Sequence, residues 1–174
     1  MDHDAKLGSW GELYVMLGTS SAALMGLLFV AISLHVDEVV KNEIVRIRSR
    51  NITIHLIATL LQAAAILTPQ SSMLLGVELL MINLLGLWPP LAFTYRAFIQ
   101  DREAGKRGGF SIYRALNYMA GYLIGAGGSA AMIAGLNWGL YLVTVSYVNA
   151  LVVAAWNAWI IILGIGRAEK DRVR

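Results

Sequence analysis

The sequence predicts an all-α membrane protein with five transmembrane helices, and three observations lead to that fold class. The composition is 57% hydrophobic and 14% charged, with a mean hydropathy of +0.62, whereas a soluble domain carries about a quarter charged residues. Apolar runs long enough to cross ~30 Å of hydrocarbon recur along the chain. Nearly all Lys and Arg residues fall in segments that would share one side of a bilayer. We therefore treat residues 1–174 as a single transmembrane domain.

The first predicted helix, residues 11–35, has one charged residue, Glu12, near its start. Thr19, Ala23 and Gly26 share one narrow face with it, since successive helical residues are about 100° apart. Small residues let helix backbones approach closely. We expect other helices to pack on this face. The segment before the helix lacks a cationic n-region and a cleavage site, so we expect it to be retained.

Two apolar runs joined by a short polar turn predict the second and third helices, residues 52–67 and 73–95. Residues 36–50 carry apolar residues at helical spacing, which predicts an amphipathic extension of the first helix or a helix on the headgroups. Pro89 and Pro90 remove backbone donors from the third helix. We expect a bend there, with the following segment leaving the membrane at an angle.

A hydrophilic, glycine-containing loop leads to the fourth and fifth predicted helices, residues 112–135 and 140–166. The fourth helix is the richest in small residues, and Gly121, Gly125 and Gly128 crowd one side of it. This pattern predicts close approach to another helix backbone.

The distribution of basic residues predicts the orientation. Every Lys and Arg except Lys6 lies after the first helix, between the third helix and the start of the fourth (up to Arg114), or in the C-terminal tail. The positive-inside rule then predicts a multi-pass protein with its N-terminus outside and its C-terminus cytoplasmic. This topology accounts for the basic residues without a nucleic-acid partner. Aromatic residues should mark the outer interface (Trp10, Tyr14, Trp138 and Tyr141) and the inner one (Tyr95, Phe110 and Tyr113).

Two carboxylates, Glu12 and Glu78, are the candidate ion- or proton-binding residues. Placing an acidic residue at mid-bilayer costs about 2.5–3.5 kcal/mol of free energy, and less toward the interface. A carboxylate inside a span therefore needs a hydrogen-bonding or charged partner, or it has a functional role. Both glutamates lie toward the outer side, where they can meet near Gln70 and Asn137. Alternatively, Glu12 is an exposed carboxylate favoured by the helix dipole, and Glu78 is hydrogen-bonded by a neighbouring helix.

A second polar layer is predicted at the membrane midplane, because four polar residues lie near the middle of their helices. These residues are Gln62, Asn83, Asn149 and Thr19. They can form interhelical hydrogen bonds, worth about 0.6 kcal/mol each on average, or line a water-filled pathway. His55 lies about a turn inside the second helix, where it can be an interface residue or a pH-sensing group.

Several chemistries are excluded by the sequence. The chain has no cysteine, so disulfides, thiolate catalysis and cysteine-ligated metals are ruled out. It contains neither a phosphate-binding Gly-rich loop with lysine nor an HExxH pattern. We expect no enzymatic activity, no cofactor and no metal site.

Four stretches of the first 95 residues carry a resemblance to a known family: WGELYVMLG (10–18), AALMGLLFVAIS (22–33), LTPQS (67–71) and LGVELL (75–80). Together they resemble a family of small bacterial inner-membrane proteins, some labelled "modulator of FtsH protease". Glu12 and Glu78 stand at fixed places in this pattern. The resemblance implies a location in the bacterial inner membrane and supplies no activity to carry over, and the label implies a membrane protease as a partner.

Two functions remain open at this point. The first is a homo-oligomeric channel or transport-like protein for a small cation or proton, with its route lined by the carboxylates and the midplane polar groups. The alternative is an interaction module that contacts another membrane protein, such as a membrane protease, or anionic lipid.

Overall fold

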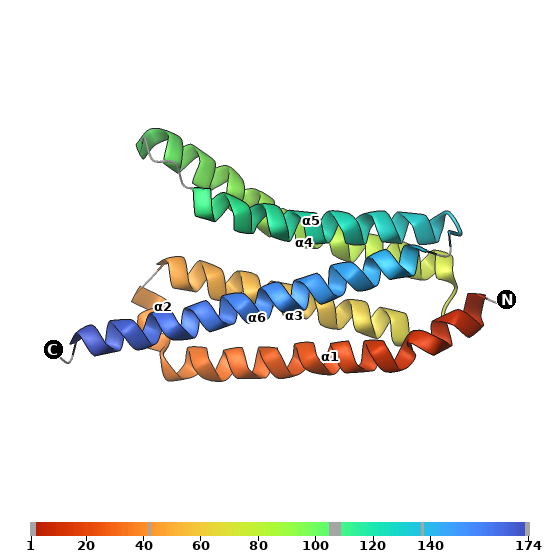
Figure 1. The fold of residues 1–174 in the computed structure, drawn as a ribbon, viewed down its shortest axis with the longest axis horizontal. Coiled ribbons are helices and arrows are strands. Elements are labelled where there is room, and N and C mark those ends of the chain that lie inside the picture. The colour runs from red at the N-terminus through yellow and green to blue at the C-terminus, as the bar shows by residue number, and fades with distance from the viewer. Residues whose placement is uncertain (1–2, 42, 105–108, 137, 173–174) are drawn as a thin grey trace.

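Six helices make up the part of the chain that the computed structural model describes, residues 3–41, 43–104, 109–136 and 138–172. They are α1 (His3–Leu34), α2 (Val36–Lys41), α3 (Glu43–Leu67), α4 (Ser72–Ala104), α5 (Gly109–Ile133) and α6 (Gly139–Arg172). The five long helices run up and down, so the two termini lie at opposite ends of the bundle (Figure 1). We call the end with the C-terminus and α2 the basic end, and the end with the N-terminus the turn end.

Four helices are long and apolar enough to cross a membrane, over Trp10–Leu34, Val45–Leu67, Ser72–Pro89 and Gly139–Ile160. In α5, the described residues include a shorter apolar stretch, Met119–Ile133. The chain is therefore a polytopic helical membrane protein, and the predicted all-α fold class is confirmed. The crossing by α5, which would make five spans, stays a prediction.

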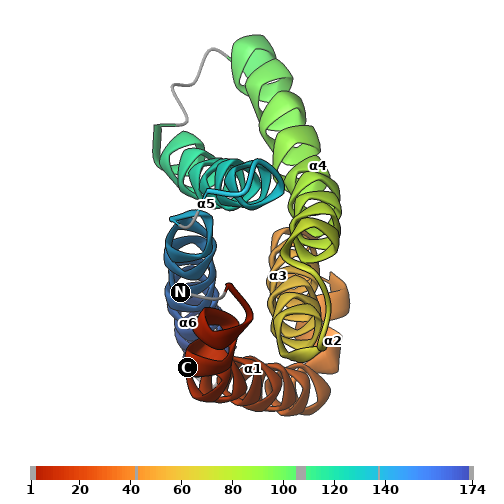
Figure 2. The ribbon, with the colours of Figure 1, turned by 90° about the vertical axis from the view of Figure 1, so that its right-hand side faces the viewer.

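The long helices form three layers (Figures 1 and 2). α4 and α5 make one outer layer, α3 and α6 the middle layer, and α1 lies alone on the other side. The most extensive helix contacts are α4 with α5, α5 with α6, and α1 with α3. Two apolar clusters fill the interior. The turn-end core consists of Tyr14, Leu17, Ala63, Ile66, Leu75, Leu79, Met132, Leu140, Val143 and Tyr147, and the basic-end core of Leu28, Ile52, Leu56 and Ala154.

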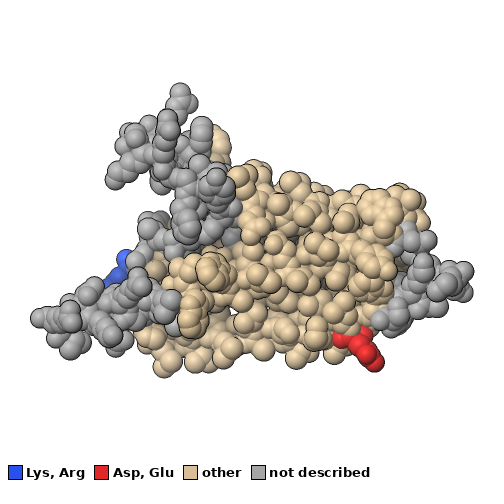
Figure 3. All heavy atoms as spheres, in the orientation of Figure 1, with Lys and Arg blue, Asp and Glu red and all other residues tan. Residues whose placement is uncertain are grey.

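The outer surface is that of a protein immersed in lipid. The face in Figure 3 is almost free of described charged side chains between a basic group at one end and an acidic group at the other. Large apolar side chains are exposed on the helices, with Phe29 71% and Leu85 69% exposed. Because lipid tails are as apolar as these side chains, their exposure costs nothing in a bilayer.

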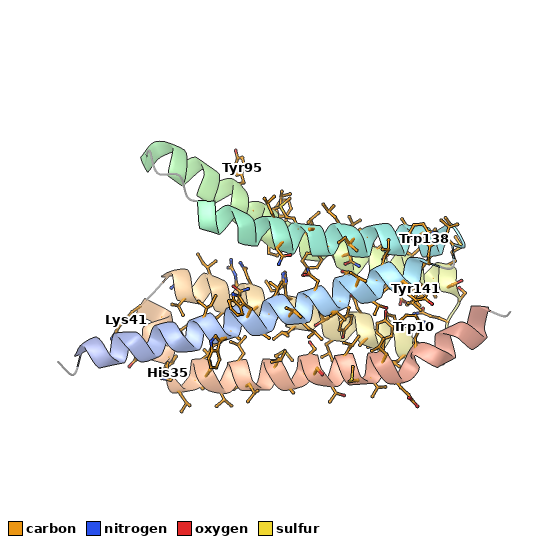
Figure 4. The ribbon with its side chains drawn as sticks, viewed as in Figure 1. Trp10, His35, Lys41, Tyr95, Trp138 and Tyr141 are labelled. Carbon is orange, nitrogen blue, oxygen red and sulfur yellow. The ribbon has the colours of Figure 1, made fainter. Side chains whose placement is uncertain are left out.

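Aromatic residues lie at both ends of this apolar surface. Trp10, Trp138 and Tyr141 lie together at the turn end, and Tyr95 lies at the basic end (Figure 4). The Trp10 and Tyr141 rings meet edge to face, with centroids 4.9 Å apart. The prediction that Tyr14 marks the outer interface is wrong, since its side chain is fully buried. The side chains of Phe110 and Tyr113 lie outside the described part of the structure.

The segment 36–50 is divided between two helices. α1 ends at Leu34, where the His35 ring nitrogen Nδ1 lies 3.1 Å from the Ala31 carbonyl. The short α2 follows, and residues 43–50 form the first two turns of α3. The segment therefore continues α1 only across a break, and α2 packs back against α3.

Local sequence explains the turns at the turn end. Ser71 caps α4, because its hydroxyl accepts a hydrogen bond from the Leu74 amide at 3.4 Å. Gly135, with φ of 74°, ends α5 in the left-handed conformation that glycine adopts most easily. The Leu136 amide then donates to the Ala131 carbonyl at 2.9 Å. α4 continues without interruption through Pro89, and its later part diverges from α3 and α6 (Figure 1).

Glycines bring α5 against both of its neighbours, as the small-residue pattern predicted. A Cβ atom on Gly128 would lie 2.7 Å from the Gly139 carbonyl oxygen of α6. On the α4 side, a Cβ atom on Gly76 would lie 3.0 Å from the Ser129 carbonyl oxygen. At both places one backbone rests directly on another helix.

Candidate functional site

Polar side chains from α3 and α4 meet between the two apolar cores. Gln62 of α3 donates from Nε2 to Asn83 Oδ1 of α4 at 3.3 Å. Asn83 in turn donates from Nδ2 to the Leu79 carbonyl at 2.7 Å. Both amides are almost fully buried, and an unsatisfied amide in an apolar interior is costly. The two side chains therefore hold α3 and α4 in one register.

His55 and Tyr122 extend this polar layer toward the basic end. The Tyr122 hydroxyl and His55 Nδ1 lie 2.7 Å apart and share a hydrogen bond. The two rings also meet edge to face, with centroids 4.9 Å apart. Tyr122 has room for its ring because Gly86 faces it on α4; a side chain at that position would overlap the phenol.

The glycine face of α5 makes room for polar groups from α4 and α6. A Cβ atom on Gly125 would contact the Asn83 amide oxygen and lie 2.7 Å from Ser146 Oγ. Similarly, a Cβ atom on Gly121 would lie 2.8 Å from Asn149 Nδ2. Because α5 has glycine at these positions, there is room for the polar groups of α4 and α6 to lie close together.

α1 reaches the same layer through Ser21. Its hydroxyl lies 2.6 Å from Thr59 Oγ1, and it donates to the Leu56 carbonyl at 2.8 Å. Ser146 on α6 donates in the same way to the Gly121 carbonyl at 2.8 Å. Every long helix therefore contributes to the layer, as expected where the only alternative partner is hydrocarbon.

This polar layer lines a small, partly open cavity of about 20 Å³. A water molecule needs about 10–15 Å³ of such space and two to four polar partners. The cavity thus has room for about one water molecule or one small dehydrated cation. Its lining contains amides, hydroxyls and an imidazole among apolar groups: His55, Ala58, Thr59, Gln62, Asn83, Gly121, Tyr122, Ser146, Asn149, Ala150 and Val153.

Three of the four predicted midplane residues line this cavity: Gln62, Asn83 and Asn149. The fourth, Thr19, is exposed on the outer face of α1, and Ser21 takes the inward position. His55 lies inside the bundle, where it joins the midplane group instead of standing at the interface.

Tyr122, Ser146 and Thr59 were not singled out from the sequence. They lie at the depth of the predicted layer, but depth alone does not distinguish them from hydroxyl residues that face lipid.

The two candidate carboxylates lie apart. Glu78 accepts a hydrogen bond from Gln70 Nε2 at 2.8 Å, and Gln70 also donates to the Ala65 carbonyl at 2.9 Å. Glu12 is exposed on α1, and α1 packs against α3 and α6 but makes no extensive contact with α4. The predicted neighbour Gln70 therefore serves Glu78 alone, while Asn137 lies outside the described residues.

Among the residues that the structure describes, no group of three His, Asp or Glu side chains could hold a metal ion. No family model matches the chain, and comparisons with curated proteins and with solved structures give no match. Fold and site alone therefore define its class, a polytopic helical membrane protein with a polar layer and a small cavity in its interior.

Proposed function

We propose that the protein carries a proton or a small cation across the bacterial inner membrane, and that its polar cavity is the binding site on that route. The observation that supports the proposal most is the lining of the cavity, which gathers amides, hydroxyls and an imidazole inside an apolar bundle. Uncharged oxygens of this kind replace the water shell of small cations in membrane channels. A cavity for about one water molecule suits a dehydrated ion or a water molecule that relays a proton.

In this proposal the proton or cation passes through a single protomer. α3, α4, α5 and α6 all line the cavity, so a binding site needs no second copy. Glu78 has a separate role in the proposal, because it lies five residues from Asn83 on α4, about 8 Å along the helix axis. Toward the turn end, its carboxylate would raise the local concentration of cations at the mouth of the route.

The test is flux through purified protein in proteoliposomes, with proton, Na⁺ and K⁺ gradients measured separately. The informative variant is Gln62→Met combined with Asn83→Leu. Replacing both partners of a hydrogen bond with apolar groups of similar shape can be nearly neutral for stability, so this variant should fold. We expect its flux to fall to the level of protein-free vesicles.

Thr19→Val is the matched control, because it removes a polar group from a helix face outside the cavity, and it should keep the flux of the unaltered protein. Glu78→Gln retains an acceptor for Gln70 and should lower flux several-fold, most clearly at low salt where charges are least screened. Full flux in the folded double variant, or no flux in the unaltered protein, would refute the proposal.

The alternative function is an interaction module that binds a second membrane protein, either another copy or a membrane protease. One observation favours it: α1 exposes the small face formed by Thr19, Ala23 and Gly26. A Cβ atom on Gly26 would meet nothing within 4 Å inside the chain. In lipid, faces of this kind drive helix association.

Gly26→Ile tests this alternative without touching the interior. If α1 binds a partner through the small face, the variant should lose oligomeric mass in mild detergent and keep its thermal stability. An unchanged mass, whether monomeric or oligomeric, would exclude the small face as an interface.

A further inference from the structure

A second, larger cavity adjoins the polar one, and it is open to the surface of the bundle, where the lining side chains of Val152 and Trp156 are 62% and 64% exposed. It has a volume of about 600 Å³ and lies between α5 and α6, toward the basic end. Its lining consists of Asn117, Val152, Val153, Ala155, Trp156, Asn157 and Trp159. Val153 also lines the polar cavity, so one side chain stands between the two spaces.

Residues of α6 connect the two cavities at helical spacing. Asn149 lines the polar cavity, Val153 lines both, and Trp156 lines the larger one. Residues three and four positions apart lie on one helix face, and four residues correspond to about 6 Å along the axis. The same face of α6 therefore extends from the polar layer into the larger cavity.

The opposite side of the polar layer is more tightly packed. Leu79, Val143 and Tyr147 of the turn-end core are 0% exposed and pack together there. α5 and α6 also touch backbone to backbone on that side, at Gly128 and Gly139. At the basic end, by contrast, the α4–α5 layer diverges from α6 (Figure 1).

From these observations we infer that the polar cavity is entered from the basic end, through the larger cavity between α5 and α6, with Val153 as the barrier residue. The inference builds on the proposed function, because it states how a small cation or proton reaches the binding site. In the orientation expected from the basic residues, this entrance faces the cytoplasm. Val153 is 8% exposed, and its carbonyl accepts a hydrogen bond from Asn157 Nδ2 at 2.7 Å. This hydrogen bond holds the α6 backbone in place at the barrier residue.

The absence of cysteine from the chain allows a direct test by single cysteine substitutions. Ag⁺ is a small cation that binds a thiol with loss of its proton. Ag⁺ is added in chloride-free buffer to either side of sealed vesicles of known orientation, and the remaining thiols are counted with a maleimide after denaturation. Asn149→Cys reports arrival at the polar cavity, and Trp156→Cys reports arrival at the larger one. The unaltered protein gives the background.

We expect Ag⁺ to reach both thiols from the basic side, and to modify the Asn149→Cys thiol much more slowly from the turn side. Adding Val153→Ala should speed the Asn149→Cys reaction about tenfold, which corresponds to roughly 1.4 kcal/mol of barrier, and adding Val153→Phe should slow it. The reaction of Ag⁺ with Trp156→Cys is the matched control. Its rate should stay the same when Val153→Ala or Val153→Phe is added, because position 156 lies on the basic-end side of the barrier.

Two results would overturn the inference: modification of Asn149→Cys that is at least as fast from the turn side as from the basic side, or an Asn149→Cys rate that is the same with valine, alanine and phenylalanine at position 153. Thermal unfolding of each variant in detergent identifies a misfolded protein. Because Ag⁺ access needs no net flux, expected labelling without flux would refute only the transport function. Flux combined with labelling that is at least as fast from the turn side would refute only the entrance.

Discussion

Two buried tyrosines of the turn-end core differ in what their hydroxyl groups contact. The Tyr14 hydroxyl lies 2.7 Å from Thr144 Oγ1. The Tyr147 hydroxyl, equally buried, lies near the Thr59 side chain but makes no hydrogen bond of good geometry within the described part of the structure. Their rings meet edge to face with centroids 5.8 Å apart, so both phenyl rings pack alike. Since an unsatisfied buried polar group costs about 1–3 kcal/mol, the two hydroxyls should affect stability in opposite directions.

We therefore predict that Tyr147→Phe keeps or raises the free energy of unfolding, whereas Tyr14→Phe lowers it by about 0.6 kcal/mol, the average for an interhelical hydrogen bond in a membrane protein. The loss stays small because Thr144 still donates to the Leu140 carbonyl, at 2.8 Å. Reversible unfolding in mixed micelles measures both values. A larger loss for Tyr147→Phe than for Tyr14→Phe would mean that the Tyr147 hydroxyl has a partner after all.

The polar residues show what a sequence of this kind discloses and what it conceals. Depth in the membrane follows from position in an apolar run, which is why Gln62, Asn83 and Asn149 were predicted to share a layer and do. Rotation about the helix axis does not follow. Thr19 and Ser21 lie at the same depth but about 200° apart on the helix, and only Ser21 faces α3. Because lipid and protein interior are equally apolar, the hydrophobic pattern does not distinguish the two faces.

At the scale of the elements, α5 depends on glycine where it touches α6. Gly127 and Gly128 are adjacent in the sequence but face different surroundings. A Cβ atom on Gly128 would lie 2.7 Å from the Gly139 carbonyl oxygen and 2.9 Å from the Val143 amide nitrogen, both backbone atoms. A Cβ atom on Gly127 would meet nothing within 4 Å. The sequence predicted a close-packed face on this helix, but the partner α6 came only from the structure.

Gly128→Ala should destabilise the protein by about 1–3 kcal/mol, the usual cost of overpacking, because α5 and α6 have to move apart. Gly127→Ala should stabilise it by up to about 1 kcal/mol, since alanine favours a helix more than glycine does. Thermal unfolding of the two variants in one detergent gives the comparison. Equal effects of the two substitutions would contradict the contact between α5 and α6.

For the whole molecule, the remaining question is whether α5 crosses the bilayer. Its described apolar stretch, Met119–Ile133, is shorter than a typical span, whereas the other four long helices qualify. The bundle nevertheless places α5 alongside α4 and α6 over most of its length (Figure 1). With five crossings the termini lie on opposite sides of the membrane. With four they lie on the same side, and the basic segments are divided between the two faces.

Reporter fusions resolve this question, and we predict opposite compartments for the two termini. A phosphatase that is active only outside the cytoplasm should be active when fused at the N-terminus and inactive when fused after Arg174, while a fluorescent protein should give the reverse. A phosphatase inserted at Gln70, in the turn between α3 and α4, should be active like the N-terminal fusion, and one inserted after Arg102 should be inactive. If the two terminal fusions report the same compartment, α5 does not cross. The segregation of the basic residues, which predicts the orientation, would then be lost, and with it the cytoplasmic entrance to the polar cavity.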